Sequence, residues 1–393
     1  MSSKPKYSYI TSTIDLKRLV SQWTKLPAIC IDLEFDKNHF KYGFNLCLIQ
    51  IFDDKEAFLI DPLSQDLDVT VLFPLLEDSN CKKVCFAFSE DLRLFHSLGC
   101  FPKGLHDLTI AKSLLGLPPI SLENILKEKL GIAPNKSQQK SNWFKRPLTE
   151  DQKRYAVEDV CYLPKLYDVI IKELQEKNRF SWFTEEMEFM ENQDYSGENN
   201  YFAIPEKERK NFTTHEWMKY ISLLEYREEL AQNLNRPSFK VIDKNLLGEL
   251  AKKQKSIVNW AAFKGIHPSL KNKKIQQKIK RILEDTENKI IKENIPNSTS
   301  VKRILSQEER IRISQLKFKL AQYKENVFQP LKVKLIEHYG EHFANFVLSN
   351  RIVEQLILSN RKLLPYQREI FYTLSKEIRL EHSTELLEGL FEK

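Results

Sequence analysis

The sequence predicts an α/β domain at the N-terminus followed by two all-α domains, and three observations support this prediction. Short apolar stretches of strand length crowd into residues 28–88. From Glu90 onward, apolar residues recur at helical spacing, and beyond residue 210 the pattern is helical throughout. A chain of 393 residues is also long enough for two or three domains.

Two segments have the composition of linkers and set the expected domain boundaries. Residues 191–210 are rich in Asn, Asp, Gly and Pro, and residues 291–303 contain the run Asn-Ile-Pro-Asn-Ser-Thr-Ser. We therefore expect the α/β domain at 1–190, a first helical domain at 211–290 and a second at 304–393.

Four strands are expected in the α/β domain. The first, Ala28–Phe35, is an apolar run interrupted by Asp32 and Glu34. Residues 45–51 and 56–60 follow after short connections, and Asp53-Asp54-Lys55 between them indicates a hairpin turn. Residues 83–88 form the fourth expected strand. The first three strands are predicted to make a meander, after which strands and helices follow.

The helices are placed by their apolar spacing and by their start and stop residues. Thr149-Glu150-Asp151-Gln152 matches the capping-box pattern and places a helix start just before Tyr155. Pro164 is expected to bend or end that helix. Further helical blocks are expected from about Thr214 to Leu283 and from Ser306 to the end.

The charges of the two halves of the chain differ. Residues 1–190 hold 25 basic and 27 acidic side chains, a net charge of −2, whereas the remaining 203 hold 36 and 27, a net charge of +9. Within the second half, residues 236–281 contain 13 basic side chains and two acids. Such a segment is either an ordinary solvated surface or a surface that contacts nucleic acid. Its excess of basic over acidic side chains favours a contact with nucleic acid.

Several classes of protein are not favoured by the sequence. The beginning, Met1-Ser2-Ser3-Lys4, lacks an apolar signal region, and no apolar stretch approaches the roughly 20 residues that cross a bilayer. The six cysteines form no CxxC pair, which favours reduced thiols over a zinc site. A phosphate-binding Gly-x-x-x-x-Gly-Lys-Ser/Thr motif is absent, so a helicase motor is not expected. No nucleotide cofactor is expected. A cytoplasmic protein that does not enter a membrane is predicted, and its protein partners are not indicated.

Four carboxylates are the candidate functional residues. Asp32 and Glu34 lie two residues apart on the first strand and so share one face. Tyr155 and Asp159 lie four apart on a helix and are also neighbours. Asp91 follows the fourth strand. Charges in apolar surroundings are costly unless they are paired or bind a metal, so these residues suggest a site for divalent cations and phosphate chemistry.

These segments, taken in order, resemble ribonuclease D within the DEDD superfamily of 3′→5′ exonucleases. Asp32-Leu33-Glu34-Phe35 resembles the first exonuclease motif, with Leu48-Ile49-Gln50 and Leu59-Ile60-Asp61-Pro62 in the strands after it. Phe88-Ser89-Glu90-Asp91 resembles the second motif. The third is the segment from Trp143 to Thr149 that runs into Tyr155-Ala156-Val157-Glu158-Asp159. The resemblance covers roughly residues 25–185 and implies a ribonuclease H-like domain, with a mixed sheet and flanking helices.

Part of the helical half resembles a second family. Trp217, Tyr226-Arg227-Glu228, Asn233 and Pro237 are similar to the HRDC domain, a helical nucleic-acid-binding module. The resemblance to ribonuclease D implies that the last 90 residues are a second such module, although no clear motif marks them.

The resemblance to ribonuclease D also implies a mechanism. Two divalent cations, Mg²⁺ or Mn²⁺, would bind the scissile phosphate. By the family's motifs, Asp32, Glu34 and Asp159 would hold the ion beside the attacking water. Asp32 would bridge to the second ion, which Asp91 would reach mainly through water. Tyr155 marks the tyrosine subtype and would orient the attacking water, because a free phenol with a pKa near 10 is a poor general base.

Contacts with nucleic acid are expected at several further residues. In the nuclease domain the candidates are Phe35, Gln50 and Lys136, although strand packing is an alternative role for Phe35 and Gln50. In the basic segment the candidates are Lys252, Lys253, Lys273 and Lys274.

The predicted function is a 3′→5′ exoribonuclease that releases 5′-nucleotides from single-stranded RNA 3′ ends, with tRNA precursors and other stable RNAs as expected substrates. Two alternatives stay open from the sequence. One is a DNA 3′→5′ exonuclease, because such a site mostly engages phosphate and metal. The other is an inactive nucleic-acid-binding scaffold, which the complete set of four carboxylates and Tyr155 argues against.

Overall fold

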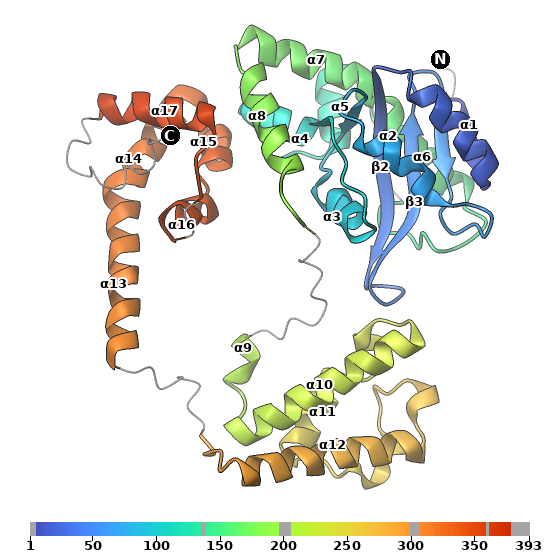
Figure 1. Ribbon diagram of the computed structural model, residues 1–393, viewed down its shortest axis with the longest axis vertical. Coiled ribbons are helices and arrows are strands. Elements are labelled where there is room, and N and C mark those ends of the chain that lie inside the picture. The colour runs from blue at the N-terminus through green and yellow to red at the C-terminus, as the bar shows by residue number, and fades with distance from the viewer. Residues whose placement is uncertain (1–4, 135–137, 196–205, 299–306, 359–360, 379–393) are drawn as a thin grey trace. The chain divides into compact units, whose positions relative to one another are not determined.

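The computed structural model describes the chain except for residues 1–4, 135–137, 196–205, 299–306, 359–360 and 379–393 (Figure 1). The chain forms two compact units. Unit 1 comprises Met1–Glu34, Leu46–Ser196 and Gln307–Lys393, and unit 2 comprises Phe35–Asn45 and Gly197–Ser306. No helix among the described residues is both long and apolar enough to cross a bilayer.

One six-stranded sheet carries the α/β part of the fold, and it is a mixed sheet, as the resemblance implies. The strand order is β1-β4-β3-β2-β5-β6. The pairs β1–β4, β2–β5 and β5–β6 are parallel, and β3–β4 is antiparallel. The strands are β1 (Tyr7–Ile10), β2 (Ala28–Lys37), β3 (Phe44–Phe52), β4 (Ala57–Ile60), β5 (Lys82–Cys85) and β6 (Leu105–Asp107). The adjacent β2, β3 and β4 are the predicted meander.

The fourth predicted strand is shorter than expected. The sequence predicts a strand over residues 83–88, but β5 ends at Cys85. Ala87 adopts a positive φ of 61°, which an extended strand does not accommodate. The chain turns here, and the carboxylate of Asp107 accepts hydrogen bonds from the backbone N–H groups of Ala87 and Phe88. The sequence does not predict the short strands β1 (Tyr7–Ile10) and β6 (Leu105–Asp107), because neither is a continuous apolar run: β1 alternates Tyr with Ser, and β6 contains His106 and Asp107.

Helices flank this sheet. They are α1 (Thr13–Trp23), α2 (Phe73–Glu77), α3 (Ser89–Ser97), α4 (Leu108–Leu114), α5 (Leu122–Leu130), α6 (Glu150–Cys161), α7 (Leu163–Glu176) and α8 (Phe180–Glu191), with a 3₁₀ turn η1 (Val69–Leu72) before α2. Trp23 of α1 packs edge-on against Phe58 of β4 at 5.1 Å between ring centroids. The predicted capping box is present at the start of α6, where Thr149 and Gln152 cap each other. Pro164 separates α6 from α7 and lies in the first turn of α7, where its missing N–H costs nothing.

The C-terminal helical stretch belongs to the same unit as the sheet. Its helices are α13 (Gln307–Tyr323), the π-helix η6 (Lys324–Phe328), α14 (Gln329–Tyr339), α15 (Glu341–Val347), α16 (Asn350–Leu358) and α17 (Pro365–Glu377). Trp182 of α8 stacks on Tyr366 of α17 at 5.3 Å, and the Arg179 guanidinium lies 5.1 Å from the ring of Tyr339. The Tyr366 hydroxyl, itself buried, donates to the Glu186 carboxylate. Aromatic stacking and a buried hydrogen bond therefore join α8 to α17, and the cation–π contact of Arg179, which precedes α8, joins this region to α14.

Unit 2 is mainly helical, as predicted for residues beyond 210. Its elements are α9 (Glu206–Arg209), α10 (Thr214–Leu234), η3 (Ser238–Lys240), α11 (Lys244–Ala251), η4 (Ile257–Ala262), η5 (Pro268–Leu270) and α12 (Lys273–Lys292). A capping box formed by Thr213 and Glu216 starts α10. Leu224, Leu247 and Trp260 lie in one buried apolar core, and the Trp260 indole donates to the Leu270 carbonyl at 2.8 Å. The boundaries of the three predicted domains, 1–190, 211–290 and 304–393, stay a prediction.

Candidate active site

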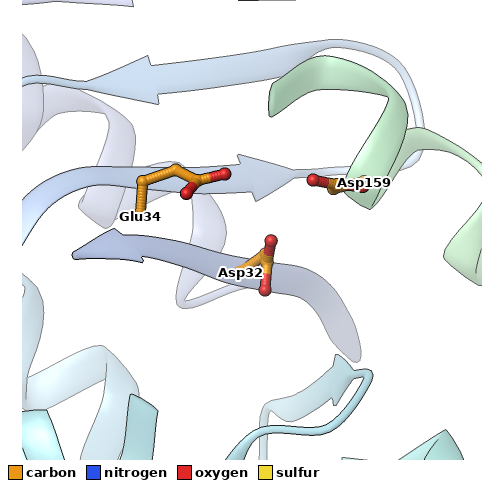
Figure 2. A group of neighbouring side chains, drawn as sticks. All are labelled: Asp32, Glu34 and Asp159. Atoms are coloured by element: carbon orange, nitrogen blue, oxygen red, sulfur yellow. The ribbon is translucent and has the colours of Figure 1, made fainter. Parts of the chain in front are cut away.

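Three carboxylates from two elements meet at one point. Asp32 and Glu34 lie on β2, and Asp159 lies on α6 (Figure 2). One oxygen from each carboxylate lies within 4.8 Å of the others. The two-residue spacing on the strand directs Asp32 and Glu34 to one face, and α6 brings Asp159 to that same face. The convergence expected of these three acids is therefore present in the structure.

Tyr155 lies one helical turn before Asp159 and contacts it. The Tyr155 hydroxyl donates a hydrogen bond to Asp159, and this bond partly offsets the rise in the pKa of that carboxyl. Its ring lies 6.0 Å from the ring of the buried Trp143. Burial raises the pKa of the Tyr155 phenol well above its usual range, and the nearby charges of Asp159, Glu34 and Asp32 raise it more. The phenol is thus a proton donor at neutral pH, which agrees with an orienting role and not with that of a base.

Asp91 lies in the first turn of α3 and is buried. Asp107 fixes the start of this helix through the two hydrogen bonds, at 3.0 and 2.9 Å, that it accepts from Ala87 and Phe88. Asp91 is outside the compact group of three acids, but it is close enough to raise the pKa values of Asp32 and Glu34. Within the described part of the chain, its Oδ1 is buried without a hydrogen-bond partner.

The acids repel one another in surroundings that contain little water. Burial, and then the nearby carboxylates, raise the pKa values of Asp32 and Glu34 well above their usual range. Burial likewise raises the pKa of Asp159 to about 7 and that of Asp91 to about 8. At neutral pH such a cluster shares protons until a cation displaces them.

The donor set fits divalent cations. Carboxylate oxygens are the ligands that Mg²⁺ and Mn²⁺ prefer, and four acids suffice for a pair of ions that also bind substrate oxygens and water. The buried and unpartnered Oδ1 of Asp91 supports the same conclusion, because buried polar atoms ordinarily have a partner. A buried cluster of acids costs free energy unless a positive charge compensates it.

The predicted nucleic-acid contacts lie in different surroundings. Phe35 packs edge-on against Phe44 at 5.1 Å. Gln50 on β3 is fully buried, and neither of its amide atoms has a hydrogen-bond partner among the described residues. Lys136 lies outside the described residues. None of these observations tests a contact with substrate, which therefore stays a prediction.

The four lysines predicted to contact nucleic acid lie at the ends of two helices of unit 2. Lys252 caps the end of α11 and is half-buried, with its ammonium group 4.5 Å from the ring of Phe212. Lys253, which follows it, and Lys273 and Lys274, in the first turn of α12, are exposed. Their exposure is compatible with the predicted contact.

Two further buried acids, Asp61 and Asp107, organise the structure, which is the role that the sequence favours for Asp107. Each directly follows or ends a strand, and each accepts hydrogen bonds that hold a neighbouring loop. An acid at the end of a strand is the local signal that could have identified Asp61 as well. Their partners lie 85 and about 20 residues away, so the pattern alone could not supply them.

Comparisons with known proteins find similar sequences and similar folds. A family model described as 3′-5′ exonuclease matches residues 7–175. A ribonuclease D of Zymomonas mobilis is 32% identical over 290 residues, which cover 71% of this chain and 72% of that protein. The crystal structure of Escherichia coli RNase D is similar with a TM-score of 0.63 at 22% identity, over 95% of this chain and 99% of that one. The catalytic core of RRP6 from Trypanosoma brucei gives a TM-score of 0.65 at 20% identity, over 74% and 82% of the two chains.

Proposed function

Because the chain belongs to the ribonuclease D family and is a 3′→5′ exoribonuclease, we propose that Asp32, Glu34, Asp91 and Asp159 form its catalytic metal site. The observation that carries this proposal is the meeting of three carboxylates from β2 and α6 within 4.8 Å. When bound, a pair of divalent cations supplies an activated water and neutralises charge on the phosphate. We further propose Mg²⁺ or Mn²⁺ as those cations.

The chain's own residues then have distinct tasks. Asp32, Glu34 and Asp159 hold positive charge where the scissile phosphate lies, and Asp91 adds a fourth carboxylate from α3. Tyr155 donates its one O–H hydrogen bond to Asp159, and its hydroxyl oxygen accepts a hydrogen bond that orients the attacking water. The phenol keeps its proton, because its pKa is raised. The buried surroundings strengthen each of these electrostatic interactions relative to water.

We propose that the helical module of unit 2 captures the RNA. The support is charge, since residues 236–281 hold 13 basic side chains and two acids, while residues 1–190 have a net charge of −2. Lysines neutralise phosphates without reading sequence, so this surface suits RNA of varied sequence. As the similar E. coli protein is described as an exoribonuclease involved in structured RNA processing, we propose the 3′ ends of tRNA precursors and other stable RNAs as substrates.

A single assay tests the catalytic proposal. The purified full chain is incubated with a 5′-labelled single-stranded RNA or the matching DNA, in Mg²⁺, in Mn²⁺ or in EDTA. The expected result is stepwise shortening of RNA from the 3′ end that EDTA abolishes. Asp159→Asn should lose nearly all of this activity, whereas Asp151→Asn, on the exposed first turn of the same helix, should keep it.

Two outcomes would contradict the proposal. Wild-type turnover by Asp159→Asn would remove that residue from the metal site. A preference for DNA over the matched RNA would change the proposed substrate class while leaving the metal site in place.

A further inference from the structure

One arginine in the nuclease unit uses all of its hydrogen-bonding capacity on the protein. Nε and Nη2 of Arg146 donate to the two carboxylate oxygens of Asp61, at 2.5 and 2.6 Å. Nη2 also donates to the Cys47 carbonyl on β3 at 2.7 Å. Nη1 donates to the carbonyls of Trp143 and Lys145, at 2.7 and 2.9 Å. A guanidinium has five N–H donors, and here five acceptors surround it.

Asp61, the acceptor of this ion pair, is held by further hydrogen bonds. Asp61 directly follows β4 and is buried. The Tyr9 hydroxyl of β1 donates to its Oδ2 at 2.6 Å, and the backbone N–H of Leu63 donates to its Oδ1 at 3.0 Å. Strands β1 and β4, the Cys47 carbonyl of β3 and the loop before α6 are thus joined through one ion pair.

The loop that Arg146 holds leads directly into the helix of the active site. Trp143 in this loop packs on the ring of Tyr155, and Thr149 at its end caps α6. Tyr155 and Asp159 lie on that helix, whereas Asp32 and Glu34 lie on the sheet. The distance between the two halves of the acidic cluster therefore depends on what attaches the start of α6 to the sheet.

We propose that Arg146 and Asp61 are positioning residues that fix α6 against the sheet and thereby bring Asp159 and Tyr155 to Asp32 and Glu34. This inference rests on the proposed metal site. Because no donor of Arg146 is left over, the guanidinium is not available to bind a phosphate of the RNA. Lysine has the same charge but three donors on one nitrogen, and it does not reproduce this planar set.

The proposal predicts a specific pattern of kinetic and binding changes. In Arg146→Lys and Asp61→Asn, Mn²⁺ affinity measured without RNA by isothermal titration calorimetry should fall about 10- to 100-fold, the range typical when a group that orients metal ligands is lost. At saturating metal, kcat should fall while KM for a short RNA stays within about twofold. The double variant should be little worse than either single variant, since both remove the same pair.

A matched control separates positioning from stability. Lys129→Gln breaks another partly buried ion pair of the nuclease unit, between Lys129 of α5 and Glu173 of α7 at 2.7 Å. It should lower the melting temperature while leaving Mn²⁺ affinity and kcat unchanged. Tyr9→Phe removes only one hydrogen bond to Asp61 and should give a milder form of the Arg146→Lys effect.

Different results would overturn different claims. If Arg146→Lys and Asp61→Asn lower the melting temperature as Lys129→Gln does but keep wild-type Mn²⁺ affinity and kcat, the positioning role is wrong. If Arg146→Lys instead raises KM with kcat unchanged, Arg146 contacts substrate. If Asp159→Asn binds Mn²⁺ as the wild type does, the proposed metal site fails, whatever the result at Arg146.

Discussion

Asp91 and Asp159 have pKa values close to neutrality because burial disfavours their charged forms. In the metal-free protein these carboxyls hold protons that the unfolded chain would release, since an ordinary Asp has a pKa near 4. The unfolding free energy of the metal-free protein should therefore depend on pH, in addition to the rate of catalysis.

We expect the unfolding free energy of the metal-free protein to decrease as pH rises from about 4 to about 8. In this window the folded protein binds more protons than the unfolded chain, so raising the pH favours unfolding. Urea unfolding in EDTA at several pH values measures the slope. Asp159→Asn should flatten the slope around pH 7, whereas Asp151→Asn should leave it unchanged. A slope that is the same in all three proteins would contradict the raised pKa of Asp159.

Tyr155→Phe should lower kcat by roughly 10- to 100-fold, because one hydrogen bond to a charged group contributes about 1.5–3 kcal/mol. RNA affinity should stay close to that of the wild type, since the acids and the basic surface are retained. Single-turnover kinetics and fluorescence anisotropy measure the two quantities. Tyr167→Phe, which removes a hydroxyl paired with His106, is the control and should keep wild-type kcat. An equal loss of affinity in Tyr155→Phe would assign the phenol to substrate binding.

Helix α8 illustrates how one element acquires its role from residues far away in the chain. Trp182 stacks on Tyr366 with 19° between the ring planes, and the Arg179 guanidinium lies 5.5 and 5.4 Å from the rings of Trp182 and Phe343. Glu186 is buried and accepts from the Tyr366 hydroxyl. This face of α8 is therefore part of a core that the C-terminal helices complete.

Trp182→Ala should lower the unfolding free energy by about 2–4 kcal/mol. This is somewhat less than the loss of a fully buried Trp costs, because the Trp182 side chain is half-buried. The substitution should weaken the packing of the C-terminal helices on α8. Limited proteolysis should therefore cut within residues 307–377 faster than in the wild type. Leu98→Ala, at a side chain that is 40% exposed in the same unit, is the control. Unchanged proteolysis in Trp182→Ala would show that the stacked pair does not hold these helices.

The parts of the fold and site that the sequence predicts are those that depend on local spacing. The two-residue spacing of Asp32 and Glu34 and the four-residue spacing of Tyr155 and Asp159 each define a shared face before any tertiary structure is known. The pairing of Arg146 with Asp61 and of Trp182 with Tyr366 depends on strand order and helix packing. No periodicity in the sequence reports contacts over 85 or 184 residues, so these could not be predicted.

For the whole molecule, the division of the chain between its two units decides how RNA capture is best tested, because the C-terminal helices belong to unit 1. A fragment that ends at residue 190 would lose α14 and α17 and uncover the apolar face of α8. Charge reversal in the intact chain avoids this problem, because it changes the basic surface without removing any packed element.

Reversing Lys252, Lys253, Lys273 and Lys274 to Glu should weaken RNA binding and flatten its dependence on salt. Each phosphate contact that is lost reduces the slope of log affinity against log salt by roughly 0.7 for a single strand. Cleavage of a short RNA at saturating concentration should be unchanged. Reversal of the exposed Lys17, Lys25, Lys172 and Lys177 of the nuclease unit, which changes the total charge equally, is the control. Equal slopes in the two variants would mean that net charge, and not this surface, governs capture.

The stacking of Trp182 on Tyr366 also has a consequence for the protein while it is being made. Translation adds about 5–20 residues per second, so the nascent α8 waits on the order of 10 to 40 seconds before α17 leaves the ribosome. During that interval the complete nuclease sheet exists beside an uncovered aromatic face. A premature stop codon after α8 and before Tyr366 would leave this aromatic face uncovered permanently. The shortened product would keep the acidic cluster of β2 and α6 but would expose the face of α8 to chaperones and proteases.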